Sequence, residues 1–490
     1  MRILHPFDPR SLDDDKMREE CAVFGIFGHD DSAAHTALGL HALQHRGQEA
    51  AGIVAFDGDQ FHAHRDLGLV GDIFSSQEVI ARLPGRSAIG HTRYSTTGDT
   101  VLRNVQPLFA DQAFGGLALA HNGNLTNAFL LRRELVERGS IFQSTSDTEV
   151  FVHLIATSRA DGLVDRMVDA LRQVEGAYSL VALADDCVIG VRDPLGVRPL
   201  VLGKLGTSHI LASETCAFDI LGAETVREVA PGEMVILDDS GVDSRRPFPP
   251  ARGRSCIFEH IYFARPDSIM EGRSVYESRR LIGAELAKES PVEADLVIPV
   301  PDSGVPAAIG YADQAGLPFE LGIIRNHYVG RTFIEPGQQI RNLGVRLKHN
   351  ANAAMLRGKR VIMVDDSIVR GTTSIKIVEM VRAAGAAEVH MRIAAPPTRE
   401  SCFYGIDTPE RGELMASRMD VPAMAAHIGV DSLAFVSIDG LYRAMGEAGG
   451  RDPQAPRYCD ACFSGDYPTR LSDREGQGRP SQLTLLAELG

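Results

Sequence analysis

The sequence predicts an α/β protein of two main domains, the second built on a doubly wound, mostly parallel sheet. Its 490 residues suffice for two to four domains at about 100–200 residues each. Beyond residue 255, short apolar runs alternate with amphipathic stretches, a pattern typical of parallel strands joined by helices. A segment rich in Pro, Arg and Gly, residues 241–255, precedes this region and indicates a domain boundary.

Composition limits the function classes. Hydrophobic residues make up 44% and charged residues 23%, as is common in globular proteins. The net charge of −15 argues against a nucleic-acid or membrane-surface binder. The sequence has neither a run long enough to span a membrane nor a secretory signal, so we expect a cytoplasmic protein with reduced cysteines.

The first part of the chain starts with a segment of different character. Residues 1–20 are polar and acidic, and we expect them to be a detachable propeptide. CAVFGIFG, starting at Cys21, predicts a buried strand. Strand-like runs and helical patterns then alternate to about residue 240, with transitions from strand to turn in 117–125, 178–186 and 234–240.

The second part follows a β-α-β pattern. We expect strands at 294–300, before Asp365 and at 388–395, and helices at 305–316 and from Ser374 to a stop at Gly385. Ligands of such sheets bind at the carboxyl ends of the strands. The expected division is a propeptide, a first domain, a second domain and a flexible tail, at residues 1–20, 21–250, 251–470 and 471–490.

The most specific string is VIMVDDSIVRGTTS, residues 361–374. It predicts a buried strand followed by two carboxylates, Asp365 and Asp366, and then by a loop with Arg370, Gly371, Thr372 and Thr373. Loop N–H groups, hydroxyls and a helix N-terminus can hold phosphate, whereas carboxylates suit ribose hydroxyls or Mg²⁺. An acidic strand end with a threonine cap is the alternative for the carboxylates alone. The whole string resembles the 5-phosphoribosyl 1-pyrophosphate (PRPP) signature of type I phosphoribosyltransferases.

A second loop supports this resemblance. VIPVPDSGVPAA, residues 297–308, predicts another strand that runs into Asp302, Ser303 and Gly304. It resembles the pyrophosphate loop of the same family, where Ser303 would contact Mg²⁺; an ordinary Pro-Gly turn is the alternative. The basic, glycine-containing stretch at 325–350 suits a flap that closes over pyrophosphate, or else a solvated loop.

Cys21 has two possible roles. A cysteine in an apolar strand is commonly a core residue. Cleavage before it would free an α-amine with a pKa of about 7.7–8.0, which could serve as the general base for its own thiol. The uncleaved chain has only an amide at this position.

Four further strings favour the second role. LQHRGQEAAGI, GHTRYSTTG, AHNGNL and STSDTE, together with ECAVFGIFG, resemble class II, N-terminal-nucleophile glutamine amidotransferases. By matching position, Arg93 would bind the α-carboxylate of glutamine and Asp147 its α-amine, while Asn122 and Gly123 would form the oxyanion hole. Taken singly, Arg93 could instead form a surface ion pair, Asp147 could cap a helix, and HNGN could form a turn. Ala22 stands where many relatives have glycine.

The two resemblances imply fold and activity together. They imply an αββα sandwich of the N-terminal-nucleophile hydrolases, followed by the doubly wound sheet of a type I phosphoribosyltransferase. The pairing resembles the glutamine–PRPP amidotransferases, which convert PRPP, glutamine and water to 5-phosphoribosylamine, glutamate and pyrophosphate. This reaction is the first committed step of de novo purine synthesis, and it implies Mg²⁺ at Ser303, Asp365 and Asp366.

The cysteines outside this site need a separate explanation. Cys459 and Cys462 form a C-x₂-C pair, which by spacing alone fits reduced cysteines or half a zinc site. Together with Cys256 and Cys402, they resemble the ligands of the amidotransferase branch that carries a structural 4Fe–4S cluster. Cys187 and Cys216 are expected in the core.

Two other functions compete with this one. A glutaminase whose second domain only senses nucleotides would not need both PRPP loops, and a regulator that binds RNA or DNA would be at odds with the charge of −15. We therefore expect no nucleic-acid or membrane partner. The resemblance implies inhibition by purine nucleotides and a homotetramer or homodimer.

Overall fold

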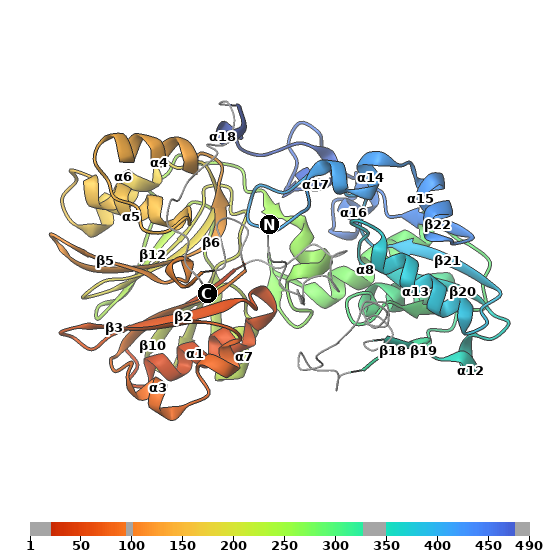
Figure 1. Ribbon diagram of the computed structural model, residues 1–490, viewed down its shortest axis with the longest axis horizontal. Helices are drawn as coiled ribbons and strands as arrows, with labels where there is room; N and C mark the ends of the chain where they lie inside the picture. The colour runs from red at the N-terminus through yellow and green to blue at the C-terminus, as the bar shows by residue number, and fades with distance from the viewer. Residues whose placement is uncertain (1–20, 95–100, 327–348, 476–490) are drawn as a thin grey trace, which may run out of the picture.

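The computed structural model describes residues 21–94, 101–326 and 349–475. The expected propeptide, the middle of the expected flap and the end of the expected tail lie outside these ranges. Figure 1 shows two lobes side by side, a two-sheet sandwich formed by the first half of the chain and a parallel sheet with helices formed by the second half.

The first lobe contains two antiparallel sheets. One has seven strands, in the order β11 (Glu224–Glu228), β9 (Val201–Leu205), β10 (Ser208–Ala212), β1 (Ala22–Phe27), β4 (Ser87–Arg93), β2 (Ala50–Phe56) and β3 (Phe61–Leu67). The other has six, in the order β13 (Gly241–Arg245), β12 (Met234–Asp238), β8 (Val188–Arg192), β7 (Gly176–Leu183), β6 (Gly115–Leu125) and β5 (Leu108–Gln112). The expected buried strand after Cys21 is confirmed as β1, in the middle of the first sheet.

Three apolar layers hold this lobe together. Val23, Val54 and Val181 belong to the layer between the sheets. The outer face of the first sheet packs on α1 (Ser32–Ala42) and α7 (Cys216–Leu221). The outer face of the second packs on α4 (Ala128–Glu137), α5 (Thr148–Thr157) and α6 (Leu163–Leu171). Helices therefore cover both outer faces (Figure 1), and the expected αββα sandwich is confirmed.

The second lobe is built on four parallel strands. Their order is β17 (Leu296–Pro299), β20 (Arg360–Asp365), β21 (Glu388–Ile393) and β22 (Ser432–Phe435). α9 (Val305–Ala315) follows β17, and Gly316 ends it with a φ of 67°. α13 (Thr372–Ala383) follows β20, so this helix begins two residues before the expected Ser374.

The order of the strands reverses beside β17. After α9 the chain returns to form a parallel bridge between Phe319 and Val297. The N–H of Val297 donates to the carbonyl of Pro318, and the carbonyl of Val297 accepts the N–H of Glu320. This bridge therefore lies on the side of β17 that faces away from β20. The chain then crosses to β20, and the reversal makes the ends of β17 and β20 a topological switch point, where such sheets bind ligands.

Two local expectations are corrected. HNGN, residues 121–124, is not a turn but the end of β6. Residues 471–475, expected in a loose tail, include the short helix α18 (Ser472–Glu475), and the carboxylate of Asp473 accepts the N–H groups of Phe129 at 3.0 Å and Leu130 at 3.1 Å.

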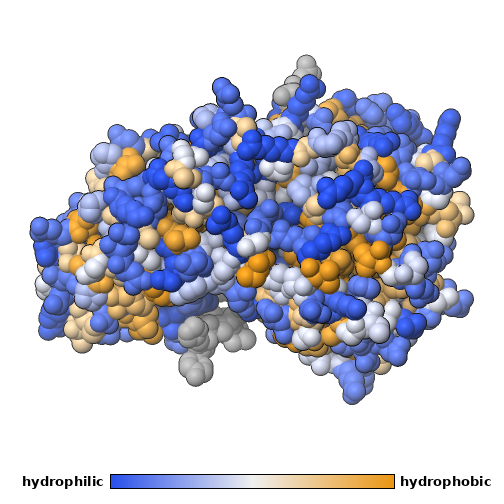
Figure 2. Space-filling model, turned by 180° about the vertical axis from the view of Figure 1, so that it is seen from behind, coloured by the Kyte–Doolittle hydropathy of each residue, from blue (hydrophilic) through white to orange (hydrophobic). Residues whose placement is uncertain are grey.

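The surface fits the composition. On the face shown in Figure 2, hydrophilic residues predominate and apolar residues gather in a few patches. Within the described ranges, no helix combines the length and apolarity that a membrane crossing requires.

Candidate active sites

Cys21 lies directly before β1, at the end of a central strand. It is 9% exposed, and its Sγ donates a hydrogen bond to the carbonyl of Tyr94 at 3.4 Å. Burial raises the pKa of the thiol to about 11, although the charge of Arg93 acts in the opposite direction. In the uncleaved chain this sulfur is thus a poor nucleophile at neutral pH, and it needs a base to react.

Arg93 is placed next to Cys21 by strand register. Ala22 pairs with Thr92, so Arg93 lies opposite Cys21 at the end of β4. Its guanidinium is buried, 3% exposed, and donates to the carbonyl of Asn104 at 3.1 Å. A surface ion pair is therefore excluded, and a buried guanidinium beside a thiol suits recognition of a carboxylate.

The second sheet contributes Asn122 and Gly123 from the end of β6. Asn122 is fully buried, and neither its Nδ2 nor its Oδ1 has a hydrogen-bond partner among the described residues. Gly123 has a φ of 138°, and a Cβ there would lie 2.1 Å from the carbonyl oxygen of Ala177. Only glycine fits this backbone, and a buried amide without a partner needs an explanation other than packing.

Asp147 completes the group. It stands before α5, yet its side chain makes no capping bond and instead accepts the N–H of Leu125 in β6 at 3.0 Å. The charges of Asp147 and Arg93 both act on the thiol of Cys21. His91 Nε2 lies 3.1 Å from the carbonyl of His121, which joins β4 to β6. Four of the five predicted residues thus come from the facing ends of two sheets, and Asp147 joins them from the start of α5.

A second group lies at the switch point of the parallel sheet. Asp365 ends β20 and Asp366 follows it; the two residues are only 3% and 2% exposed. Asp366 donates its N–H to Asp365 Oδ1 at 2.9 Å, and Ser367 donates its hydroxyl to Asp366 Oδ1 at 2.5 Å. Two adjacent buried carboxylates are costly without a cation or hydrogen-bond donors, which makes this pair a suitable magnesium or ribose site.

The other predicted loop lies against this pair. Val300 N–H donates to Val364 O at 2.8 Å, and a Cβ on Gly304 would lie 2.5 Å from the same oxygen. The loop at 301–304 therefore approaches the end of β20 closely. Asp302 contacts Arg325, the one basic residue of the expected flap that the structure describes; Arg331, Arg341, Arg346 and Lys348 lie outside the described residues.

The loop from Arg370 to Thr373 starts α13. Gly371 precedes the helix with a φ of 83°, a conformation that favours glycine. The first N–H groups of a twelve-residue helix thus follow the carboxylate pair after a short loop, residues 367–371. Arg370, predicted to bind PRPP, has its guanidinium 2.7 Å from the carboxylate of Glu413.

The four cysteines far apart in the sequence come together. Cys256 and Cys459 are opposite each other in a two-strand parallel ladder of β14 (Ser255–Cys256) and β23 (Tyr458–Cys459). The carbonyl of Cys462 accepts the N–H of Glu400 at 3.1 Å, two residues from Cys402. Burial raises the pKa of the Cys462 thiol, and the other three thiolates raise it further.

Four thiolates are the usual ligand set of a 4Fe–4S cluster. Among the described residues, however, no group of three or more His, Cys, Asp or Glu side chains is arranged to hold a metal ion. The fully buried guanidinium of Arg198 lies near Cys256, Cys402 and Cys459 and would offset negative charge there. Cys187 and Cys216 are core residues, as expected.

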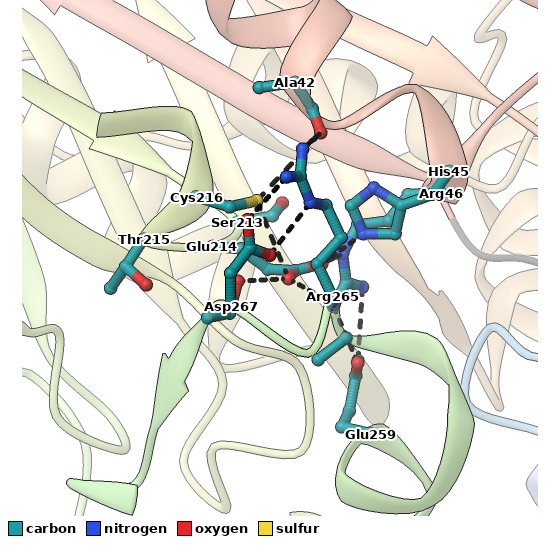
Figure 3. A network of polar contacts seen from close by, with 12 residues as sticks. Ala42, His45, Arg46, Ser213, Glu214, Thr215, Cys216, Glu259, Arg265 and Asp267 are labelled. Atoms are coloured by element: carbon teal, nitrogen blue, oxygen red, sulfur yellow. Dashed lines mark hydrogen bonds and ion pairs between the residues drawn. The ribbon is translucent and has the colours of Figure 1, made fainter. Parts of the chain in front are cut away.

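Some polar residues in the core were not predicted. Arg46, Glu214 and Glu259 are almost completely buried and joined to one another (Figure 3). Arg46 belongs to the string HRGQ that was used for the resemblance, but nothing in the sequence indicated its buried partners.

Comparison with known proteins identifies two corresponding domains. Residues 91–219 match a glutamine amidotransferase domain, and residues 272–401 match a phosphoribosyl transferase domain. The amidophosphoribosyltransferase of Rhizobium etli is 58% identical over 485 residues, which cover 98% of each chain. The chain belongs to the amidophosphoribosyltransferase family.

Further amidophosphoribosyltransferases extend the agreement. That of Bacillus subtilis is 50% identical over 93% of this chain and 95% of its own. A crystallised glutamine PRPP amidotransferase from B. subtilis, complexed with ADP and GMP, superposes with a TM-score of 0.87 at 49% identity, over 92% of this chain and 98% of the other. The activity is therefore transfer of the amide nitrogen of glutamine to PRPP, which yields 5-phosphoribosylamine, glutamate and pyrophosphate in purine biosynthesis.

Proposed function

We propose that the two reactions are divided between the two sites. Glutamine is hydrolysed at Cys21, and the ammonia is used where β17 and β20 end. The observation that carries this proposal is the meeting of Cys21, Arg93, Asn122 and Gly123 at the facing ends of two sheets, with Asp147 at the start of α5. Removal of residues 1–20 frees the α-amine of Cys21, which takes the thiol proton; the high pKa of the buried thiol makes such a base necessary.

The remaining residues of the glutaminase site have separate roles. The buried guanidinium of Arg93 binds the α-carboxylate of glutamine, and Asp147 binds its α-amine. Sulfur attack on the amide carbon places negative charge on the amide oxygen. Asn122 Nδ2, which has no partner among the described residues, and the N–H of Gly123 stabilise this charge. The protonated α-amine returns its proton to the amide nitrogen, so that the intermediate expels ammonia and leaves a thioester, which water hydrolyses to glutamate and free thiol.

At the second site, the α13 N-terminus and the loops at 301–304 and 370–373 bind the phosphates of PRPP. Asp365 and Asp366, with Ser303, would hold Mg²⁺, which supplies positive charge to the departing pyrophosphate. Asp302 and Gly304 belong to the pyrophosphate loop. The two carboxylates also accept hydrogen bonds from the ribose hydroxyls, which orients C1 for attack by ammonia.

Further assignments follow from the same family. Cys256, Cys402, Cys459 and Cys462 would bind a structural 4Fe–4S cluster, which ties segments of the second domain together. The B. subtilis structure with ADP and GMP supports purine nucleotides as inhibitors. We further propose a homotetramer or homodimer in the cytoplasm, and domains at residues 21–250 and 251–470.

Asp366→Asn tests the second site. The substitution keeps the size of the side chain but removes its charge, so product formation from PRPP should fall with ammonia as well as with glutamine as the nitrogen donor. Loss of the glutamine-driven reaction alone would refute the assignment of Asp366 to PRPP or Mg²⁺. Iron analysis of anaerobically purified protein tests the cluster, and absence of iron would refute it.

A further inference from the structure

Gln106 carries a buried amide that takes no direct part in the proposed glutaminase reaction. It lies two residues before β5 and is 3% exposed. Its Oε1 accepts the N–H of His121 in β6 at 2.7 Å, and its Nε2 donates to Thr148 Oγ1, at the start of α5, at 3.0 Å. Both ends of the amide are thus paired, and they join two elements next to predicted site residues.

The bond to His121 extends the sheet beyond the end of its edge strand. The pairing of β5 with β6 ends at Leu108 opposite Leu119, two residues before His121. Since β5 no longer lies beside it, the N–H of His121 needs another acceptor, because a buried N–H without one is costly. Gln106 Oε1 supplies this acceptor, so one side chain holds the backbone of β6 where β5 has ended.

The proposed oxyanion donors lie between two such anchors. Asn122 and Gly123 directly follow His121. Two residues beyond Gly123, the N–H of Leu125 is accepted by the carboxylate of Asp147 at 3.0 Å. The end of β6 is therefore held by a side-chain acceptor on each side of the pair. A donor stabilises an oxyanion only if it points to the position that the charged oxygen will occupy, so this strand end has to be fixed.

The bond to Thr148 fixes the same strand relative to α5. Thr148 Oγ1 also lies 3.3 Å from His121 Nδ1, so the amide, the imidazole and the hydroxyl meet. Thr148 directly follows Asp147, the proposed partner of the α-amine of glutamine. Gln106 therefore ties the strand that carries the oxyanion donors to the start of the helix that carries the amine-binding carboxylate.

The backbone that carries Gln106 is itself firmly held. A Cβ on Gly52 in β2 would lie 2.3 Å from Gln106 O, so this backbone packs closely on the first sheet. Two residues earlier, the carbonyl of Asn104 accepts the guanidinium of Arg93 at 3.1 Å. The side-chain amide of Asn104 bonds to the hydroxyl and the N–H of Thr145 at 2.8 and 2.9 Å. A side chain can position a reacting group only if it is supported in this way.

We propose that Gln106 is a positioning residue for glutamine hydrolysis, whose amide holds Asn122 and Gly123 where the charged oxygen of the tetrahedral intermediate forms. The groups that bind the α-carboxylate and the α-amine of glutamine have anchors of their own. Loss of the amide therefore lowers the rate of the chemical step more than it weakens the binding of glutamine. This inference deepens the proposed function and rests on the proposed roles of Cys21 and the oxyanion donors.

The test is Gln106→Met in the processed full enzyme, which keeps the length of the side chain but removes both hydrogen bonds. Asn127→Leu is the matched control, since Asn127 is a second buried amide with both ends paired, at 3.0 and 2.9 Å. In Gln106→Met we expect kcat with glutamine to fall about tenfold to a hundredfold, as a misplacement of about 1 Å causes, and KM to stay within about threefold. The ammonia-driven rate should stay within about twofold in both variants, and Asn127→Leu should keep its glutamine-driven rate.

A second measurement separates positioning from support of the fold. Glutamate γ-semialdehyde forms a bond between its aldehyde carbon and the sulfur of Cys21, which places negative charge on its oxygen in the oxyanion hole, whereas glutamate binds without that bond. In Gln106→Met, the affinity for the aldehyde should fall by the same factor as kcat, and the affinity for glutamate should not change.

Other outcomes overturn the inference. An unchanged kcat in folded Gln106→Met, an equal loss of the glutamine- and ammonia-driven rates, or an equal loss of affinity for the aldehyde and for glutamate would show that Gln106 only stabilises the fold. If Gln106→Met does not fold, Thr148→Val, which lacks the hydroxyl that holds Nε2, decides by the same two affinities. A wild-type enzyme that the aldehyde does not inhibit would refute the proposed role of Cys21 instead.

Discussion

The Asn122→Ala variant tests whether Asn122 contributes to catalysis rather than to the stability of the fold. A buried polar group without a hydrogen bond costs about 1–3 kcal/mol, and the amide of Asn122 is such a group among the described residues. Its removal relieves this cost and offsets the packing lost with the side chain. We therefore expect the free energy of unfolding to change by less than about 1 kcal/mol, although the site is fully buried.

Asn127 supplies the matched comparison. It is also buried, but its Nδ2 donates to the carbonyl of Gln173 at 3.0 Å and its Oδ1 accepts the N–H of Glu175 at 2.9 Å. Asn127→Ala leaves these two groups without partners and should lower the free energy of unfolding by about 1–3 kcal/mol. Urea denaturation of both variants measures the difference.

The glutamine-driven activity should show the opposite pattern, with the larger loss in Asn122→Ala and not in Asn127→Ala. Loss of one oxyanion-hole donor typically lowers kcat by about 10²–10³, which corresponds to about 2.7–4 kcal/mol. Asn122→Ala should lose this factor in the glutamine-driven reaction and keep the ammonia-driven rate, while Asn127→Ala should keep both at a temperature where it is folded. A destabilised Asn122→Ala, or one with full glutamine-driven activity, would refute the reasoning.

Three further predictions concern the same sites. Gly123→Ala should abolish the glutamine-driven reaction in steady-state assays, because its Cβ would lie 2.1 Å from Ala177 O; retained activity would contradict the close approach. In the unprocessed chain, the raised pKa of Cys21, about 11, leaves little thiolate at neutral pH, so alkylation followed by mass spectrometry should accelerate about tenfold per pH unit up to that pKa; a plateau near pH 8 would contradict the effect of burial. Cys402→Ser should lower the iron content of anaerobically purified protein, whereas Cys187→Ser, far from the four cysteines in the first-domain core, should not; equal iron in both would contradict the ligand assignment.

The sequence predicted those parts of the molecule that depend on local patterns. The strand before Asp365 and the helix after it follow from a few adjacent residues, so β20 and α13 were predicted to within two residues. The αββα sandwich came from the resemblance. HNGN was open to interpretation as a turn because Asn-Gly favours turns locally, whereas pairing of Gly123 with Tyr178 in β7 keeps it in a strand.

The buried contacts of Arg46 with Glu214 and Glu259 could not be predicted in this way. Arg46 and Glu259 are 213 residues apart, and charged residues are rarely buried, so no local signal indicates that they form a pair. Asp473 was assigned to a tail because its neighbours are polar, and its bonds to the N–H groups of Phe129 and Leu130 again depend on a contact distant in sequence. Such pairs become visible only when the domains are assembled.

The central claim is that Cys21 releases the ammonia that the PRPP site consumes. Cys21→Ala in the processed enzyme, supplied with PRPP and Mg²⁺ and with either glutamine or ammonia, tests it most directly. The account predicts loss of 5-phosphoribosylamine formation from glutamine and an ammonia-driven rate like that of the wild type. Continued use of glutamine by this variant, or loss of the ammonia-driven reaction in a folded protein, would contradict it.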